Sequence, residues 1–119
     1  MIVNTPNNPT GVVYSEETIR KMAAILEKKQ KEYGISIYLI SDEPYRELAY
    51  DGVKVPYLTK YYDNTIVGYS FSKSLSLPGE RIGYLVMPDA WTAQKKSLRQ
   101  QPLRTVSLDM SMLRPCFRG

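Results

Sequence analysis

The chain has 119 residues, enough for one small domain or part of a larger one and too few for two. It contains one cysteine and no histidine, which excludes an internal disulfide and any catalytic or metal site that depends on histidine. There is no apolar run long enough to span a membrane and no signal-peptide pattern, so we expect a cytoplasmic protein that makes no membrane contact. Catalysis by this chain must therefore use lysine, tyrosine, aspartate or a cofactor.

The formal net charge of +4 is unevenly distributed along the chain. Residues 1–90 carry a net charge of −1, whereas residues 91–119 carry +5. The basic excess belongs to the last quarter, and it gives no reason to expect an acidic partner for the rest.

The N-terminal part predicts a strand, a loop and a helix in that order. Residues 1–3 are typical of the end of a strand, and residues 4–11 hold so many Asn, Pro and Gly residues that only a loop can form. Ser15 has the position of an N-cap, and Gly34 has that of a helix stop. Between them, apolar residues recur at helical spacing, which predicts a helix of about four or five turns.

The middle of the chain adds three further strands. Residues 35–40, 65–70 and 81–87 are rich in β-branched and aromatic residues. Residues 42–64 are irregular, and the segment 71–80 contains a Pro-Gly turn. Strands alternating with a helix and with loops predict an α/β fold with a mainly parallel sheet.

Polar side chains follow the predicted strands, where open α/β sheets collect their functional groups. Each of them has an ordinary explanation when taken alone, as a turn former, a cap or a solvated surface residue. Their joint occurrence at adjacent strand exits predicts a site instead. The residues are Asn8, Asp42, Tyr45, Ser70, Ser72, Lys73 and Arg81.

Three motifs, in this order and with these gaps, carry a family resemblance. They are Asn7-Asn8-Pro9-Thr10-Gly11, Ser41-Asp42-Glu43-Pro44-Tyr45, and Ser70-Phe71-Ser72-Lys73 followed by Pro78-Gly79-Glu80-Arg81-Ile82-Gly83. On these motifs the chain resembles the fold-type I pyridoxal-phosphate aminotransferases of class I/II. The resemblance implies that residues 1–88 form part of a three-layer α/β/α large domain that binds this cofactor.

The resemblance also implies catalytic roles for individual residues, with pyridoxal 5′-phosphate as cofactor. Lys73 would form the Schiff base with the cofactor aldehyde and move the proton at the substrate α-carbon. Asp42 would pair with the protonated pyridine nitrogen and so keep the ring an electron sink. Tyr45 and Asn8 would hydrogen-bond the 3′-oxygen of the cofactor.

The phosphate group would be held by a separate set of residues. The resemblance assigns Ser70, Ser72 and Arg81 to it, and a guanidinium fork suits phosphate oxygens. No metal and no nucleic acid is expected at this site.

The implied reaction of a full-length relative is transfer of an amino group from an amino acid to a 2-oxo acid, by a homodimer. We expect this chain to be truncated at both ends and inactive alone, because such sites are completed by a second subunit and by other segments. Two alternatives stay open. The motifs fit another enzyme of this cofactor class (a β-lyase, a decarboxylase or a cyclopropane-forming synthase), and the chain could be a non-catalytic remnant.

Residues 89–119 leave the family pattern and form a basic, divergent tail, apart from a weak helical pattern near 89–99. Residues 109–118 can be encoded so that another reading frame continues an aminotransferase sequence, which suggests a frameshift. A tail that binds nucleic acid is the rival explanation, but the segment lacks interleaved aromatic residues or a known module.

Overall fold

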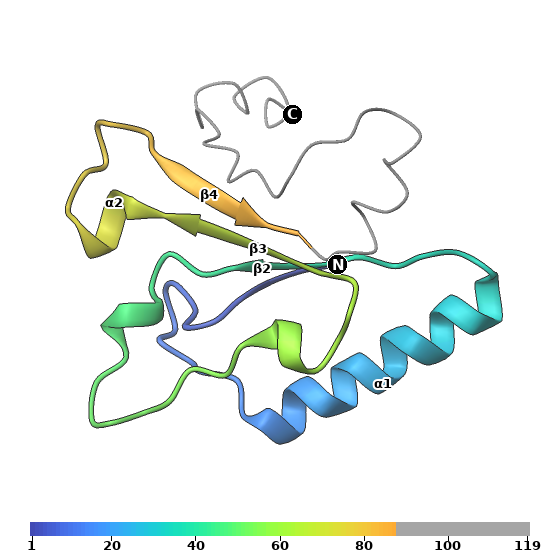
Figure 1. Ribbon diagram of the computed structural model, residues 1–119. Helices are drawn as coiled ribbons and strands as arrows, with labels where there is room; N and C mark the ends of the chain where they lie inside the picture. The colour runs from blue at the N-terminus through green and yellow to red at the C-terminus, as the bar shows by residue number, and fades with distance from the viewer. Residues whose placement is uncertain (88–119) are drawn as a thin grey trace.

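The computed structural model describes residues 1–87, which contain a four-stranded sheet. The strands lie in the order β1 (Ile2–Asn4), β2 (Leu39–Asp42), β3 (Thr65–Ser70) and β4 (Gly83–Val86). The first three are parallel and β4 is antiparallel to β3. The expected α/β class with a mainly parallel sheet is confirmed. As a consequence, the carboxyl ends of β1, β2 and β3 meet at one edge, at the left of Figure 1.

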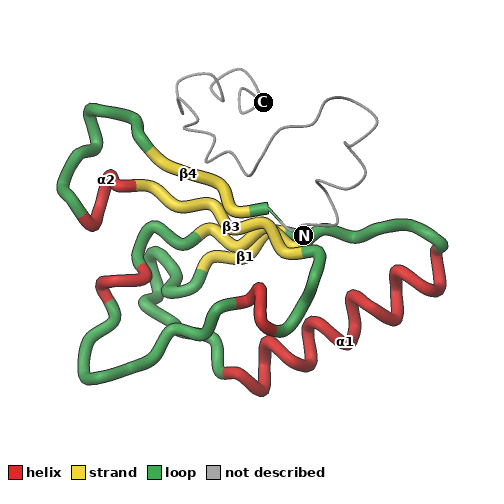
Figure 2. Tube along the Cα trace, viewed as in Figure 1, coloured by secondary structure: helices red, strands yellow, loops and turns green. Residues whose placement is uncertain are grey.

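The long helix α1 (Glu16–Tyr33) connects β1 to β2 and covers one face of the sheet (Figure 2). Short 3-10 helices, η1 (Arg46–Leu48) and η2 (Leu58–Lys60), interrupt the connection from β2 to β3, and α2 (Phe71–Ser74) follows β3 directly. Residues 1–87 thus supply the sheet and one helical layer of the expected three-layer domain.

The predicted ends of α1 are confirmed. The Ser15 hydroxyl accepts a hydrogen bond from the Thr18 backbone N–H at 3.2 Å, so it caps the first turn. Glu16 and Glu17 lie in that turn, where the helix dipole favours negative charge. Gly34 ends the helix at φ 65°, a left-handed conformation that glycine adopts without steric cost.

Two strands begin later than the sequence predicts. In β2 the first residue is Leu39, because Leu39 pairs with Thr65 and Ile40 with Ile2, the first residues of the two neighbouring strands. Residues 35–38 lie beyond those ends. In β4 the first residue is Gly83 rather than Arg81, whose φ of 54° is incompatible with an extended strand.

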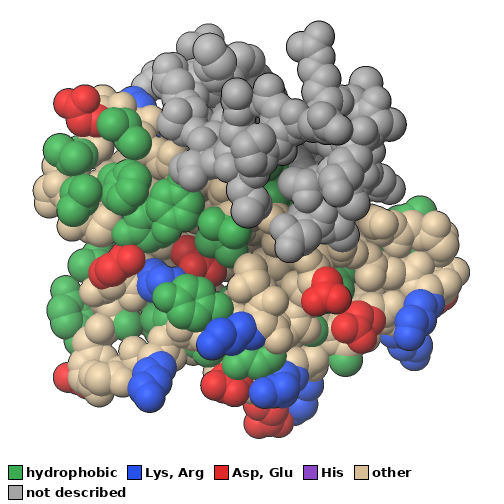
Figure 3. Space-filling view, viewed as in Figure 1, with side chains coloured by type: hydrophobic (Ala, Val, Ile, Leu, Met, Phe, Trp, Pro, Cys, Tyr) green, Lys and Arg blue, Asp and Glu red, His purple; other side chains and the backbone are tan. Residues whose placement is uncertain are grey.

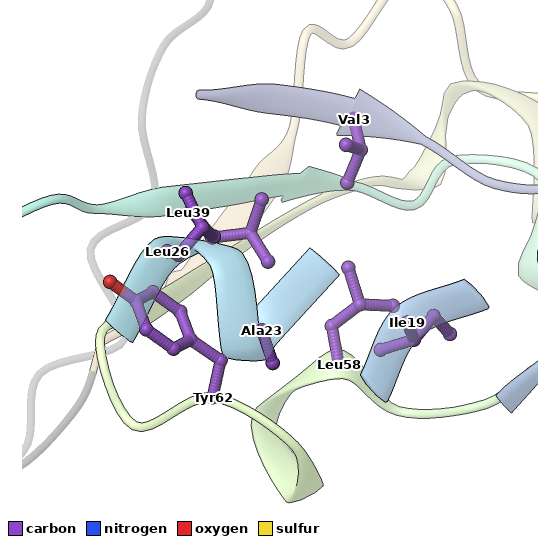
Figure 4. Packing of buried hydrophobic residues seen from close by; sticks show 7 residues of the cluster. All are labelled: Val3, Ile19, Ala23, Leu26, Leu39, Leu58 and Tyr62. Carbon is purple, nitrogen blue, oxygen red and sulfur yellow. The ribbon is translucent and has the colours of Figure 1, made fainter. Parts of the chain in front are cut away.

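The hydrophobic core lies between α1, the sheet and the segment around η2 (Figure 4). From α1, side chains spaced by three and four residues point into it, as expected for one face of a helix. The Tyr62 hydroxyl at its border donates to the Ile37 carbonyl oxygen at 2.5 Å. The buried members are Val3, Ile19, Ala23, Leu26, Leu39, Leu58 and Tyr62.

Charged side chains of both signs are interspersed along the α1 side of the surface, whereas hydrophobic side chains gather toward α2 and β4 (Figure 3). Two exposed ion pairs, Glu17–Lys21 at 2.6 Å and Glu16–Arg20 at 3.6 Å, join successive turns of α1. Each contributes only about 0.3–0.5 kcal/mol. Among the described helices, none is long and apolar enough to cross a bilayer. The predicted helix near 89–99 and the basic tail lie outside the described residues.

Candidate functional site

The site is built at the carboxyl edge of the sheet, where Asn4 of β1 pairs in register with Asp42 of β2. The Asn4 side-chain amide donates to the Asp42 backbone carbonyl at 2.9 Å and to Asp42 Oδ2 at 3.4 Å. Asn4 therefore orients the Asp42 carboxylate from the neighbouring strand.

The loop after β1 is shaped by hydrogen bonds from its own side chains. Asn4 Oδ1 accepts from the Asn8 backbone N–H at 3.0 Å, and Asn7 Oδ1 accepts from the Thr10 hydroxyl at 2.8 Å. Gly11 closes the loop at φ 70°, in the left-handed region. The loop thus has a defined conformation, and within residues 1–87 it leaves Asn8 exposed.

Asn8, Tyr45 and Lys73 converge although they come from three different loops or helices. Asn8 Nδ2 donates to Tyr45 Oη at 2.9 Å, and Lys73 Nζ lies 5.9 Å from the centroid of the Tyr45 ring. All three line one cavity of about 520 Å³. Its remaining wall is mostly apolar and includes Leu48 and Val53. A primary amine, a phenol and an amide thus meet in a space large enough for a small organic molecule.

Asp42 is exposed, yet its pKa is raised above the usual value of 3.8. Loss of hydration is the largest cause, the charge of neighbouring Glu43 adds to it, and the hydrogen bond from Asn4 opposes it. A positive charge placed against Asp42 would reverse this shift, so the position favours a cationic ligand group.

Ser70 and Ser72 form the start of α2. Ser70 Oγ accepts from the Ser72 backbone N–H at 3.2 Å and lies 2.8 Å from Ser72 Oγ. Ser70 also lines a small hollow of about 60 Å³ together with Asp42. At the other end of α2, the Tyr69 hydroxyl donates to Ser74 Oγ at 2.7 Å. The turn that carries Lys73 is thereby fixed at both ends.

Within residues 1–87, Arg81 is the one predicted site residue that shares neither a hydrogen bond nor a hollow with another predicted site residue. Its guanidinium donates to the Pro78 carbonyl oxygen at 3.0 Å, and it lines neither hollow. Its backbone is close to the site, because Ser70 pairs with Gly83 across β3 and β4. The structure therefore gathers Asn8, Tyr45 and Lys73 in one group and Asp42, Ser70 and Ser72 in another.

Two features of the site were missed at the level of sequence. Asn4 ends β1, so the same rule about strand exits could have identified it. A buried ion pair between Glu43 and Arg46, at 2.6 Å, lies directly behind the turn from Asp42 to Tyr45. Only the three-residue spacing of the two charges hinted at this pair, and such spacing is common on exposed surfaces.

Comparison with known proteins decides the family. The sequence model described as "Aminotransferase class I and II" matches residues 1–107, most of the chain. The chain belongs to this family. Among curated relatives, a probable aspartate/prephenate aminotransferase of Aquifex aeolicus is 34% identical over 111 residues, which cover 90% of this chain and 27% of that protein.

Solved structures agree with this assignment. An amino transferase of Eubacterium rectale is 69% identical, with a TM-score of 0.73, over 74% of this chain and 22% of that one. A pyridoxal-phosphate-bound C–S lyase of Staphylococcus hominis is 26% identical, with a TM-score of 0.63, over 84% of this chain and 25% of that one. The chain thus spans about a quarter of the length of the relatives that it matches.

Proposed function

We propose that this chain is the cofactor-binding part of a pyridoxal-phosphate aminotransferase, which transfers an amino group from an amino acid to a 2-oxo acid. One observation carries the proposal: the Lys73 amine, the Tyr45 hydroxyl and the Asn8 amide line the same cavity. Family membership supports it.

The residues present fit the cofactor. Within residues 1–87, the Lys73 amine has no ion-pair partner and faces only the Tyr45 ring, so it is available to a carbonyl group. The Asp42 carboxylate accepts one hydrogen bond and lacks a cationic partner in the same region. The hydroxyls of Ser70 and Ser72 are half-buried at the N-terminus of α2.

In this proposal, pyridoxal phosphate supplies the electron sink that makes the amino acid α-carbon acidic. Lys73 Nζ would bind the aldehyde of the group covalently, with loss of water, and afterwards would hold and return the proton of the α-carbon. Asp42 would accept a hydrogen bond from the protonated ring nitrogen and keep it charged. Tyr45 Oη and Asn8 Nδ2 would bind the ring hydroxyl oxygen.

The phosphate would be bound by Ser70 and Ser72, with the Arg81 guanidinium added after rotation away from Pro78. That rotation costs one exposed hydrogen bond, which is a small barrier. Homodimeric assembly and a cytoplasmic location remain predictions of this proposal.

Direct labelling tests the proposal. The purified chain is incubated with pyridoxal phosphate, reduced with borohydride and digested, and the modified peptide is identified by mass. We expect the label at Lys73. Labelling spread over several lysines with equal yield would refute a defined site.

The C–S lyase similarity favours a second candidate, β-elimination of a sulfur substituent by the same residues. The two reactions can be separated in a chimera. In it, residues 1–87 replace the matching segment of the Eubacterium rectale aminotransferase. Amino transfer in that chimera, without release of thiol from a cysteine conjugate, supports the first proposal. Thiol release as the faster reaction supports the second.

A further inference from the structure

We propose that Arg46 is a positioning residue for the site: it fastens the loop 53–57 to the turn that carries Asp42 and Tyr45, and thereby sets the position of the Tyr45 hydroxyl. We refer to Ser41, Glu43, Arg46 and the loop 53–57 as the Arg46 network. The proposal depends on the proposed function in one respect: binding of the cofactor is the reason why the Tyr45 hydroxyl has to be held in place.

The network begins with a buried carboxylate. Glu43 is 2% exposed, and its backbone N–H extends the ladder between β2 and β3 by donating to the Gly68 carbonyl at 2.8 Å. The Ser41 hydroxyl donates to Glu43 Oε1 at 2.8 Å. Glu43 is therefore fixed to the sheet through both its backbone and its side chain.

Arg46 supplies the positive charge that this buried carboxylate requires. Its Nε donates to Glu43 Oε2 at 2.6 Å, and its Nη2 lies 2.6 Å from the same oxygen. A buried, hydrogen-bonded ion pair of this kind restricts its partners far more than an exposed pair does.

The same guanidinium reaches across to the loop 53–57. It donates to the Val55 carbonyl at 2.7 Å and to the Pro56 carbonyl at 3.1 Å, and its centre lies 3.9 Å from the Tyr57 ring centroid. Planar geometry with several donors and a stacking face is a property of arginine that lysine lacks. Arg46 thus joins the turn after β2 to the loop 53–57.

Tyr45 is the residue immediately before Arg46, at the start of η1. Its carbonyl accepts from the Leu48 backbone N–H at 2.9 Å, and its hydroxyl accepts from Asn8 Nδ2 at 2.9 Å. When the Arg46 side chain is replaced, η1 loses its side-chain attachments to Glu43 and to the loop 53–57. The Tyr45 ring then loses the fixed direction that brings its hydroxyl to Asn8.

The test uses the full chain without cofactor and compares Arg46→Met and Arg46→Lys with the wild type by NMR. We expect the Asn8 side-chain amide resonance to move in both variants toward its position in Tyr45→Phe. We also expect the Leu48 backbone amide to exchange on the order of tenfold faster in Arg46→Met. Arg46→Lys keeps the charge beside Glu43, so it serves as the folded variant if Arg46→Met unfolds.

Arg20→Met is the matched control. Arg20 also pairs with a carboxylate, Glu16, and lies 4.8 Å from a tyrosine ring centroid, that of Tyr61, but far from the site along the chain. It should leave the Asn8 resonance unchanged. An unchanged Asn8 resonance in both Arg46 variants, or an equal shift in Arg20→Met, would overturn the proposal.

A purely structural role for Arg46 would lower the melting temperature without moving the Asn8 resonance of the native state. Because no cofactor is present, this outcome is independent of whether the chain binds pyridoxal phosphate. Failure of the labelling experiment at Lys73 would refute the proposed function and leave this test intact.

Discussion

Asn8 Nδ2 donates to Tyr45 Oη at 2.9 Å across 37 residues of sequence. The bond forms because β1 and β2 are parallel neighbours, so the loops at their carboxyl ends lie side by side. It joins two residues that the proposal assigns to the same cofactor oxygen, and it holds the Tyr45 hydroxyl in the cavity before any ligand arrives.

Removal of the Tyr45 hydroxyl should weaken cofactor binding. One hydrogen bond contributes about 1 kcal/mol, so Tyr45→Phe should lower the affinity for pyridoxal phosphate about fivefold, measured by absorbance titration. Tyr50→Phe is the control, because Tyr50 lines the same cavity and makes no side-chain hydrogen bond within residues 1–87. An equal loss in both variants would contradict a specific role for Tyr45.

Lys73→Ala should abolish the borohydride-stable label, because no other primary amine lines the cavity in the described part of the chain. Lys60→Ala is the matched control, because the Lys60 amine also faces a tyrosine ring, at 5.7 Å from the Tyr57 centroid. Labelling should be unaffected by that change. Persistence of the label in Lys73→Ala would exclude Lys73 as the attachment point.

Asp42→Asn should stabilise the chain in a pH-dependent manner. The pKa of Asp42 is raised above 3.8 in the folded state, so the native protein binds its proton more tightly than the unfolded chain does. Below pH 3.8 the carboxyl group is protonated in both states, and the variant should match the wild type. As the pH rises through the folded pKa, the wild type loses stability that the variant keeps.

Melting temperatures between pH 3 and pH 7 measure this difference, which should grow toward neutral pH. Asp63→Asn removes an exposed carboxylate elsewhere on the surface and should show no such trend. A variant that is less stable than the wild type at pH 7 would contradict the prediction.

Gly83→Ala should be strongly destabilising. A Cβ at Gly83 would overlap the Tyr69 carbonyl oxygen and lie 3.4 Å from Ser70 Cα, both in the paired strand β3. Overpacking against backbone costs about 1–3 kcal/mol, measured as the free energy of unfolding in urea. Gly79→Ala has no atom within 4 Å of the added carbon and should change stability by less than about 1 kcal/mol. Similar losses in both variants would contradict the close approach of β4 to β3 as the cause, because the change from glycine to alanine by itself lowers the entropy of the unfolded chain and favours folding.

Much of the fold follows from local patterns in the sequence. The ends of α1 depend on Ser15 and Gly34, which act within one turn of the helix, and both were predicted correctly. The start of β2 was predicted wrongly because a strand extends only as far as its neighbours do, and residues 35–38, although strand-like in composition, precede the first registered pairs with β1 and β3. Likewise, the start of β4 depends on the left-handed backbone of Arg81, which the residue type does not disclose.

The sequence by itself determined which chemistry is present: a lysine, an aspartate, a tyrosine and an asparagine after strands, without histidine, in the order of one enzyme family. Only the tertiary structure decided how these groups are combined. Parallel pairing of the strands allows Asn4 to donate to Asp42 and Asn8 to donate to Tyr45. The Arg81 guanidinium instead donates to the nearby Pro78 carbonyl. The physical reason is that residue type fixes which hydrogen bonds a side chain can donate or accept. Which partners it finds depends on strand register and on long-range packing, as the hydrogen bond from Arg46 to the Val55 carbonyl shows.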